Sequence, residues 1–191
     1  GRLRIEPHSS SREEGGIEAT PFGHAVASKG ISLGSARELE RWIAESETRV
    51  WSDLDPILAA TLTPDGRMYN VALTAREYDS GEYLRLLKDA VGEEEICTEV
   101  PLGRLKDCTV TPFFEEVRAM KIALFLRDWI EHAPQRELEE QYHTMTGQML
   151  SAAEQVSWLI DAASAIAQAQ HCSEGFVQRL RTLSERVQRG L

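Results

Sequence analysis

The chain has 191 residues, a formal net charge of -10 and 42% hydrophobic residues, so it is long enough to bury a sizeable core in one or two domains. No apolar run reaches the roughly 18–20 residues that span a bilayer, and no signal-peptide pattern opens the chain. The sequence therefore predicts a cytoplasmic protein without a membrane partner. Its three irregularly spaced cysteines favour a reducing compartment and predict neither a disulfide framework nor a metal site.

The first residues are predicted to be extended. Apolar residues near Leu3 and Ile17 form two short strands around a polar tip at residues 9–16, a pattern typical of an exposed hairpin. Thr20 and Pro21 then begin a short helix, because threonine caps helices and proline is tolerated at the first helical position. We expect this helix to end at Gly30.

The middle of the chain gives weaker patterns. Three helices are expected there: one at residues 35–45, capped by Ser35, one from residue 53 or 55 to 62, and one at residues 82–91. The sequence Thr63-Pro64-Asp65-Gly66 predicts a turn, since proline presets φ and glycine accepts a positive φ. Residues 67–80 are expected to form a loop with a short strand or helix, and residues 96–111 carry little pattern.

From Pro112 onward the helical signal is strong. Helices are predicted at residues 112–131, 135–142 and 146–170, and from residue 173 or 174 to 189, with Thr146 as the cap of the third. The predicted fold class is therefore mainly α: a multi-helix bundle with a small N-terminal β-hairpin.

Trp158 stands apart from the apolar face of the long helix at 146–170. At about 100° per residue it lies roughly 160–200° from the middle of the apolar stripe. Its neighbours on that side are small or polar. A large aromatic side chain in this setting is either packed by another helix or offered to a ligand such as a nucleobase. The stripe itself consists of Met149, Ala152, Ala153, Val156, Leu159, Ile160, Ala163, Ile166 and Ala167.

Motifs for catalysis are absent from the sequence. It lacks the phosphate-binding loop of nucleotide hydrolases, the dinucleotide-binding glycine pattern and the nucleophile elbow of hydrolases. The five histidines are scattered without the spacing of ligands or of a catalytic triad. These residues predict no catalytic site and no cofactor in this chain.

Only the last predicted helix is locally basic, within a chain that is acidic as a whole. Acidic proteins can still bind nucleic acid along one basic groove, so the net charge does not exclude it. A solvated helix face is the plainer interpretation of this pattern. The basic residues concerned are Arg179, Arg181, Arg186 and Arg189.

Two segments resemble the Ski-like branch of the superfamily II helicases, especially archaeal fork-processing helicases and their bacterial relatives. Residues 17–42 are similar to the stretch where a winged helix ends and a helical bundle begins. Residues 120–167 are similar to the central block of that bundle, and residues 183–191 to the segment before a helix-hairpin-helix domain. Positions of the central block that match are Lys121, Asp128, Trp129, Ile130, Tyr142, Gly147, Glu154, Trp158 and Leu159.

The resemblance implies a fragment of an ATP-dependent helicase that acts in DNA repair. Residues 1–34 would be the end of a winged helix, and residues 35–191 a helical bundle that acts as a ratchet. Motor domains before Gly1 would bind ATP and magnesium. The implied partners are single-stranded or forked DNA, with RNA also possible, and those motor domains.

The resemblance also implies a site, because in that family a tryptophan of the long bundle helix stacks on a base of the single strand. Trp158 matches it. The arginine that the family often has seven residues earlier is Ser151 here, a departure that Gln155 or Gln148 would offset with a hydrogen bond. Further expected strand contacts are Lys121, Arg179 and Arg186.

Other interpretations remain open for the same residues. A helical protein–protein interaction module would use Trp158 as an interface anchor, since tryptophan is favoured at interface hot spots. Lys121 would otherwise be a solvated surface lysine. Trp42 and Trp129 are expected in the core, and Trp51 is undecided.

Overall fold

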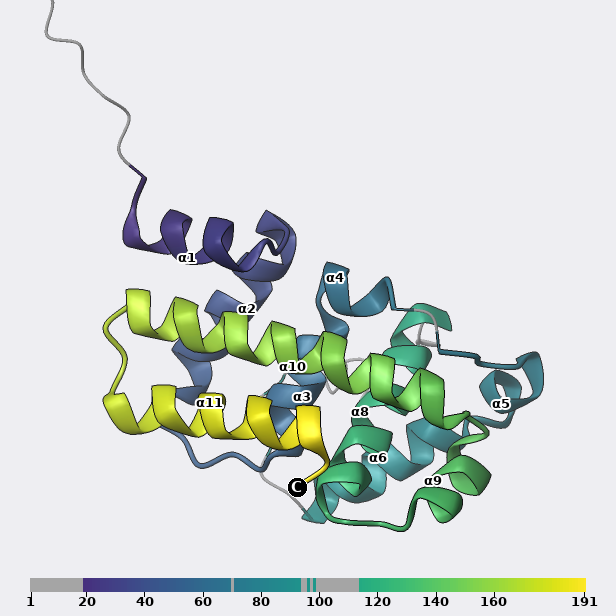
Figure 1. Ribbon diagram of the computed structural model, residues 1–191. Coiled ribbons are helices and arrows are strands. Elements are labelled where there is room, and N and C mark those ends of the chain that lie inside the picture. The colour runs from purple at the N-terminus through teal and green to yellow at the C-terminus, as the bar shows by residue number, and fades with distance from the viewer. Residues whose placement is uncertain (1–18, 70, 94–95, 97, 99–113) are drawn as a thin grey trace, which may run out of the picture.

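The computed structural model describes residues 19–69, 71–93, 96, 98 and 114–191, and all regular structure in that part is helical (Figure 1). The predicted mainly α class is confirmed. The predicted N-terminal hairpin falls almost entirely outside the described residues. The helices are α1 (Pro21–Lys29), α2 (Leu33–Ser46), α3 (Leu54–Leu62), α4 (Pro64–Arg67), α5 (Ala75–Ser80), α6 (Glu82–Glu93), α8 (Phe114–Ile130), α9 (Gln135–Tyr142), α10 (Thr146–Ala169) and α11 (Glu174–Arg189).

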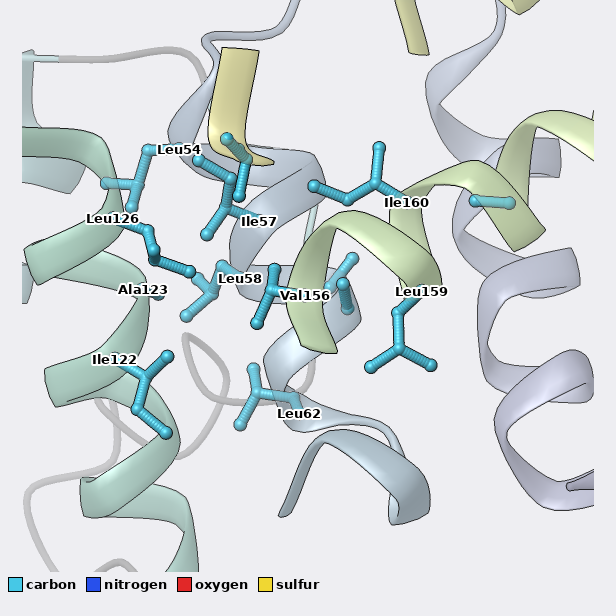
Figure 2. Packing of buried hydrophobic residues seen from close by; sticks show 14 of the residues in the cluster. Leu54, Ile57, Leu58, Leu62, Ile122, Ala123, Leu126, Val156, Leu159 and Ile160 are labelled. Atoms are coloured by element: carbon cyan, nitrogen blue, oxygen red, sulfur yellow. The ribbon is translucent and has the colours of Figure 1, made fainter. Parts of the chain in front are cut away.

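Helix α10 is the central element of the bundle. It packs along α11, and α1 lies along its other side (Figure 1). Helices α2 and α3 also contact α10, while α8 packs on α3 and carries α6 and α9. Figure 2 shows where α3, α8 and α10 meet in the core, and each aliphatic side chain buried there contributes about 1.5–3 kcal/mol. Among the side chains at this junction are Leu54, Ile57, Leu58, Ile122, Leu126, Val156, Leu159 and Ile160.

The predicted apolar stripe of α10 is confirmed, because all nine of its residues are buried. The helix is also covered outside that stripe, where Ser157, Ala162 and Ser164 are buried as well. Part of the cover comes from α11, since the Ser184 hydroxyl donates a hydrogen bond of 2.8 Å to the carbonyl of Ser157. Periodicity reveals the widest apolar face of a helix, whereas these additional contacts involve small residues that carry no strong apolar signal.

The turn predicted at residues 63–66 is wrong, because these residues begin the short helix α4. The Thr63 hydroxyl caps this helix by accepting a hydrogen bond of 3.0 Å from the Gly66 amide. Gly66 does not have a positive φ. Glycine is required there for a different reason: a Cβ atom would collide with the backbone carbonyl of Ala60.

Two predicted helix caps are also wrong. Ser32, not Ser35, caps α2, and the Ser35 hydroxyl instead accepts a hydrogen bond of 2.9 Å from the Asp65 amide of α4. Thr146 lies inside the first turn of α10, where its amide donates a hydrogen bond of 3.1 Å to the Glu139 carboxylate of α9. The Thr146 hydroxyl also donates to this carboxylate, so both side chains join neighbouring helices, a tertiary role that outweighed their local capping preference.

Helix α5 lies within residues 67–80, where the pattern of apolar residues is weak. Thr74 and Glu77 form a capping box in which each side chain bonds the other's backbone amide. The threonine and glutamate three residues apart are a known signature of a helix start. This local signal was therefore present in the sequence.

Candidate nucleic-acid interface

Trp158 lies half-buried in the middle of α10, beside the last residue of α1. Its indole N–H donates a hydrogen bond of 2.8 Å to the backbone carbonyl of Lys29. The Lys29 ammonium forms an ion pair with Asp161, three residues further along α10. From Trp158 towards its C-terminus, the outer side of α10 is thus covered by α1 (Figure 1).

The N-terminal half of α10 has an open face, which we define as Gly147, Leu150, Ser151 and Glu154. All four residues are exposed. Trp158 lies at the end of this open face, where the cover by α1 begins. The indole is therefore held from one side and accessible from the other.

The structure groups three of the expected contact residues with Trp158. Gln148, Ser151, Gln155 and Trp158 fall within about 80° of one another around α10. Ser151 is exposed, whereas both glutamines are half-buried. The backbone carbonyl of Gln148 accepts a hydrogen bond of 3.3 Å from the Tyr69 hydroxyl, which leaves its amide side chain uncommitted by that contact. These residues form one continuous stripe that ends at the indole.

A groove between α10 and α11 borders the other side of Trp158. Three carboxylates and one guanidinium line it, so its local charge is negative. Arg181 also donates a hydrogen bond of 2.6 Å to the side-chain oxygen of Gln168. A negative groove repels phosphate groups and tolerates an uncharged ring. The lining residues are Glu154, Ser157, Trp158 and Asp161 of α10, with Arg181, Ser184, Glu185 and Gln188 of α11.

Arg179 and Arg186 are not brought to Trp158. They lie roughly 160° around α11 from the groove residues, on the edge that faces the linker between α2 and α3. The Arg179 guanidinium stacks 3.7 Å from the ring centre of Trp51 and donates a hydrogen bond of 3.1 Å to its carbonyl. Arg186 forms an ion pair with Asp53. Both arginines therefore fasten this linker to α11.

Trp51, which the sequence left undecided, belongs to the core. It is 3% exposed and packs edge-on against Trp42 and Phe176. Trp42 is buried as predicted, and its indole N–H donates a hydrogen bond of 2.9 Å to the Asp55 carboxylate. These contacts explain why Arg179 rests on a fixed surface.

Lys121 is buried rather than at the surface, which corrects both sequence-based expectations for it. Its ammonium donates hydrogen bonds of 2.8 Å to the Glu77 carboxylate and 2.6 Å to the Ala72 carbonyl. The Tyr83 hydroxyl donates a third bond, of 2.7 Å, to the same carboxylate. Burial acts to raise the pKa of Glu77, but the hydrogen bonds from Lys121, Thr74 and Tyr83 outweigh it and lower this pKa to about 2. We therefore assign Lys121 a structural role.

Trp129 provides a useful counterpart to Trp158. It is also half-buried, and its indole N–H also donates to a backbone carbonyl, that of Val187 at 3.1 Å. Gly190 lies so close to the ring that a Cβ atom there would overlap it. The expected core position of Trp129 is thus only partly confirmed, because one part of the ring stays accessible.

Sequence reasoning missed Lys29 and Asp161. Lys29 ends a different helix and lies 132 residues before Asp161. No periodicity or motif links positions so far apart.

Among the described residues, no group of histidine, cysteine, aspartate and glutamate side chains is placed to hold a metal ion. None of the helices in this part of the chain combines the length and the apolar character that a membrane span requires.

Comparison with known proteins agrees with this architecture. The family model of archaeal helicase domain 4 matches residues 58–190, which include α8, α10 and α11. The chain therefore belongs to the archaeal helicase domain 4 family, and the predicted resemblance to these helicases is confirmed.

Two curated relatives share part of this sequence. Both are named ATP-dependent DNA helicase Hel308. The protein from Pyrococcus horikoshii is 32% identical over 75 residues, and that from Pyrococcus abyssi is 34% identical over 74 residues. Each match covers 39% of this chain and 10% of the relative, so the matched part spans about a tenth of the length of these relatives.

Proposed function

We propose that this chain is the strand-contacting accessory region of an ATP-dependent superfamily II helicase, in which Trp158 stacks on a base of the translocating single strand. The observation that carries the proposal is the half-buried indole at the end of the open face of α10. Membership of the helicase domain 4 family and the names of the two relatives support it.

The chemistry of the site suits a base better than a phosphate. Stacking of a base on an aromatic ring contributes about 1–3 kcal/mol and has little sequence preference. The carboxylates of Glu154 and Glu185 keep phosphate groups at a distance from the ring, whereas that of Asp161 is paired with Lys29. Ser151 supplies no positive charge, so the side chains of Gln155 and Gln148 offer hydrogen bonds in place of an ion pair.

The rigidity of α10 gives the contact a mechanical role. Its apolar stripe is buried against several helices, so the backbone that carries Trp158 is fixed relative to the bundle. A stacking ring on this fixed helix would hold the strand while motor domains elsewhere in the full-length protein bind ATP and magnesium and move. Single-stranded or forked DNA is the proposed partner, with RNA as a further possibility.

A titration with oligothymidylate tests the proposal. Binding is expected to quench the emission of Trp158, and Trp158→Ala is expected to weaken binding about 5- to 150-fold, which corresponds to the loss of one stacked base. Trp129→Phe is the matched control, because it alters another half-buried indole on a different helix. Equal affinity of Trp158→Ala and the unaltered chain across a salt series would refute strand stacking.

A protein-interaction module is the second candidate. Large apolar side chains lie exposed at the start of α10, with Met145 78% and Leu150 50% exposed, and Met68 at the end of α4 is 79% exposed. Exposed apolar side chains of this size are typical of interaction surfaces. This alternative predicts that oligothymidylate leaves the emission of Trp158 unchanged.

A further inference from the structure

Lys29, the last residue of α1, contacts α10 at two positions one helical turn apart, Trp158 and Asp161. We propose that Lys29 is a positioning residue for Trp158, and that its two contacts form a clasp that makes strand contact depend on the seating of α1. The strand part of this inference rests on the proposed function, whereas the clasp itself does not.

The first half of the clasp is the Lys29 carbonyl. The last carbonyls of a helix have no partner within the helix. At the end of α1, the Gly30 amide donates to the carbonyls of Val26 and Ala27. The indole N–H of Trp158 donates to the carbonyl of Lys29. A donor on one edge of a planar ring and a fixed acceptor restrict the rotation of that ring. The carbonyl therefore sets the plane that Trp158 presents at the end of the open face.

The second half is the Lys29 ammonium, which pairs with Asp161. Asp161 lies three residues after Trp158 and hence on the same side of α10. The side chains of Lys29 and Asp161 are 30% and 41% exposed, so water competes for this pair. The clasp therefore closes in a defined geometry but opens at little cost.

Helix α1 buries fewer residues than α3 does. Within α1 only Ala25 is buried, with Phe22 and Val26 partly buried against the core, whereas all nine residues of α3 are buried. An element with few buried apolar contacts opens at a lower free energy than the rest of the fold. Movement of α1 therefore carries the Lys29 carbonyl away from the indole without unfolding the bundle.

The position of α1 in the chain gives the clasp a direction. The helix lies within residues 1–34, the segment that the resemblance implies to be the end of a winged helix. A displacement of that segment relative to the bundle would move α1 and release Trp158. Conversely, a strand stacked on Trp158 favours the ring orientation that the clasp holds, and so favours the seated α1.

Solvent exchange of the indole N–H protons tests the clasp. In a ¹⁵N-labelled chain, the Trp158 signal is assigned by its loss in Trp158→Phe, and Trp129 serves as the internal control. Asp161→Asn and Lys29→Met are each expected to speed exchange of the Trp158 proton about two- to fivefold and to leave Trp129 unchanged. Unchanged exchange of Trp158 in both variants overturns the clasp, whatever the strand does.

Affinity for oligothymidylate tests the positioning role. Asp161→Asn removes a negative charge beside the site, so simple electrostatics predicts tighter binding, whereas loss of the clasp predicts binding about two- to fivefold weaker. The exchanged pair Lys29→Asp with Asp161→Lys is expected to restore both affinity and slow exchange. Tighter binding by Asp161→Asn overturns the positioning role.

The two proposals fail in different ways. If Trp158→Ala binds oligothymidylate as well as the unaltered chain, the proposed function and the strand part of the clasp both fall, and the exchange result alone decides whether Lys29 anchors α1. If Trp158→Ala weakens binding but Asp161→Asn tightens it, the strand contact stands and the positioning role falls.

Discussion

Two regions of the molecule combine a lysine, a carboxylate and an aromatic side chain. At the corner between α5, α6 and α8, Lys121 pairs with Glu77 beneath Tyr83. At the edge between α1 and α10, Lys29 pairs with Asp161 beside Trp158. The first lysine and carboxylate side chains are 1% and 8% exposed, and the second are 30% and 41% exposed.

Burial decides what each arrangement does. At the corner, the Glu77 carboxylate accepts hydrogen bonds from Lys121, Tyr83 and Thr74. Both of its oxygens therefore have partners, and the position of the carboxylate is fixed. At the edge, water reaches both partners and the contacts break at low cost. The same three kinds of side chain thus make a fixed structural contact at the corner and an adjustable contact at the edge, where the candidate site lies.

The largest expected effect is at the corner. Lys121→Met leaves the buried Glu77 carboxylate without its cation, and we expect a loss of about 3–5 kcal/mol in the free energy of unfolding. Urea denaturation measures this loss. The double variant Lys121→Met with Glu77→Gln removes the stranded charge and should recover part of the stability. A loss below about 1 kcal/mol in Lys121→Met would show that the pair is not a fixed structural contact.

Acid is expected to weaken the same contact. The pKa of Glu77 is about 2 in the folded chain, below its ordinary value of 4.5. The carboxylate thus contributes stability that is complete above about pH 4.5 and is lost as the pH falls towards 2, up to about 3 kcal/mol. Denaturation between pH 6 and 2 measures it, and Glu77→Gln should flatten this part of the profile. An equally steep profile in Glu77→Gln would assign the acid sensitivity to other groups.

The edge should respond much less. Lys29→Met is expected to lower the free energy of unfolding by at most about 1 kcal/mol, because its pair with Asp161 is partly hydrated. The effect should shrink further in about 1 M salt, where charges are screened within about 3 Å. Arg136→Met, which breaks an exposed pair with Glu140 on α9, is the matched control. A loss as large as that of Lys121→Met would erase the distinction between the two regions.

The smallest expected effect concerns ligand binding at the edge. Glu154→Gln removes one carboxylate from the groove beside Trp158, and we expect about twofold tighter binding of oligothymidylate because phosphate repulsion falls. Glu137→Gln, which removes an exposed charge on α9, should leave the affinity unchanged. Equal gains in both variants would point to net charge rather than to this groove.

The helices of the C-terminal half were predicted well from the sequence, because their apolar periodicity is strong and short non-periodic segments separate them. The predicted segment 135–142 coincides with α9, and the predicted start and end of α11 also agree with the structure. The prediction was weaker where a side chain bonds a neighbouring helix, as at Ser35 and Thr146. Helix start signals are local, so they cannot anticipate such partners.

The arrangement of the candidate site could be predicted only in part, because some of its contacts also join separate helices. The position of Trp158 outside the apolar stripe followed from spacing alone. The cover by α1 did not, since the acceptor on Lys29 lies 129 residues away. Lys121 was misplaced because a buried lysine needs a buried partner, and nothing in the sequence connects it with Glu77, 44 residues earlier. Arg179 and Arg186 share a helix with groove residues but face its opposite edge.

The length of the N-terminal half of α10, which carries the open face, also sets the length of strand that it can contact. From Thr146 to Trp158 the helix rises about 18 Å at 1.5 Å per residue. Successive bases of a stacked strand are about 3.4 Å apart, so this length corresponds to roughly five base steps. A strand that runs along the helix would reach its full contact with an oligonucleotide of about six nucleotides, and longer oligonucleotides would add little at this surface.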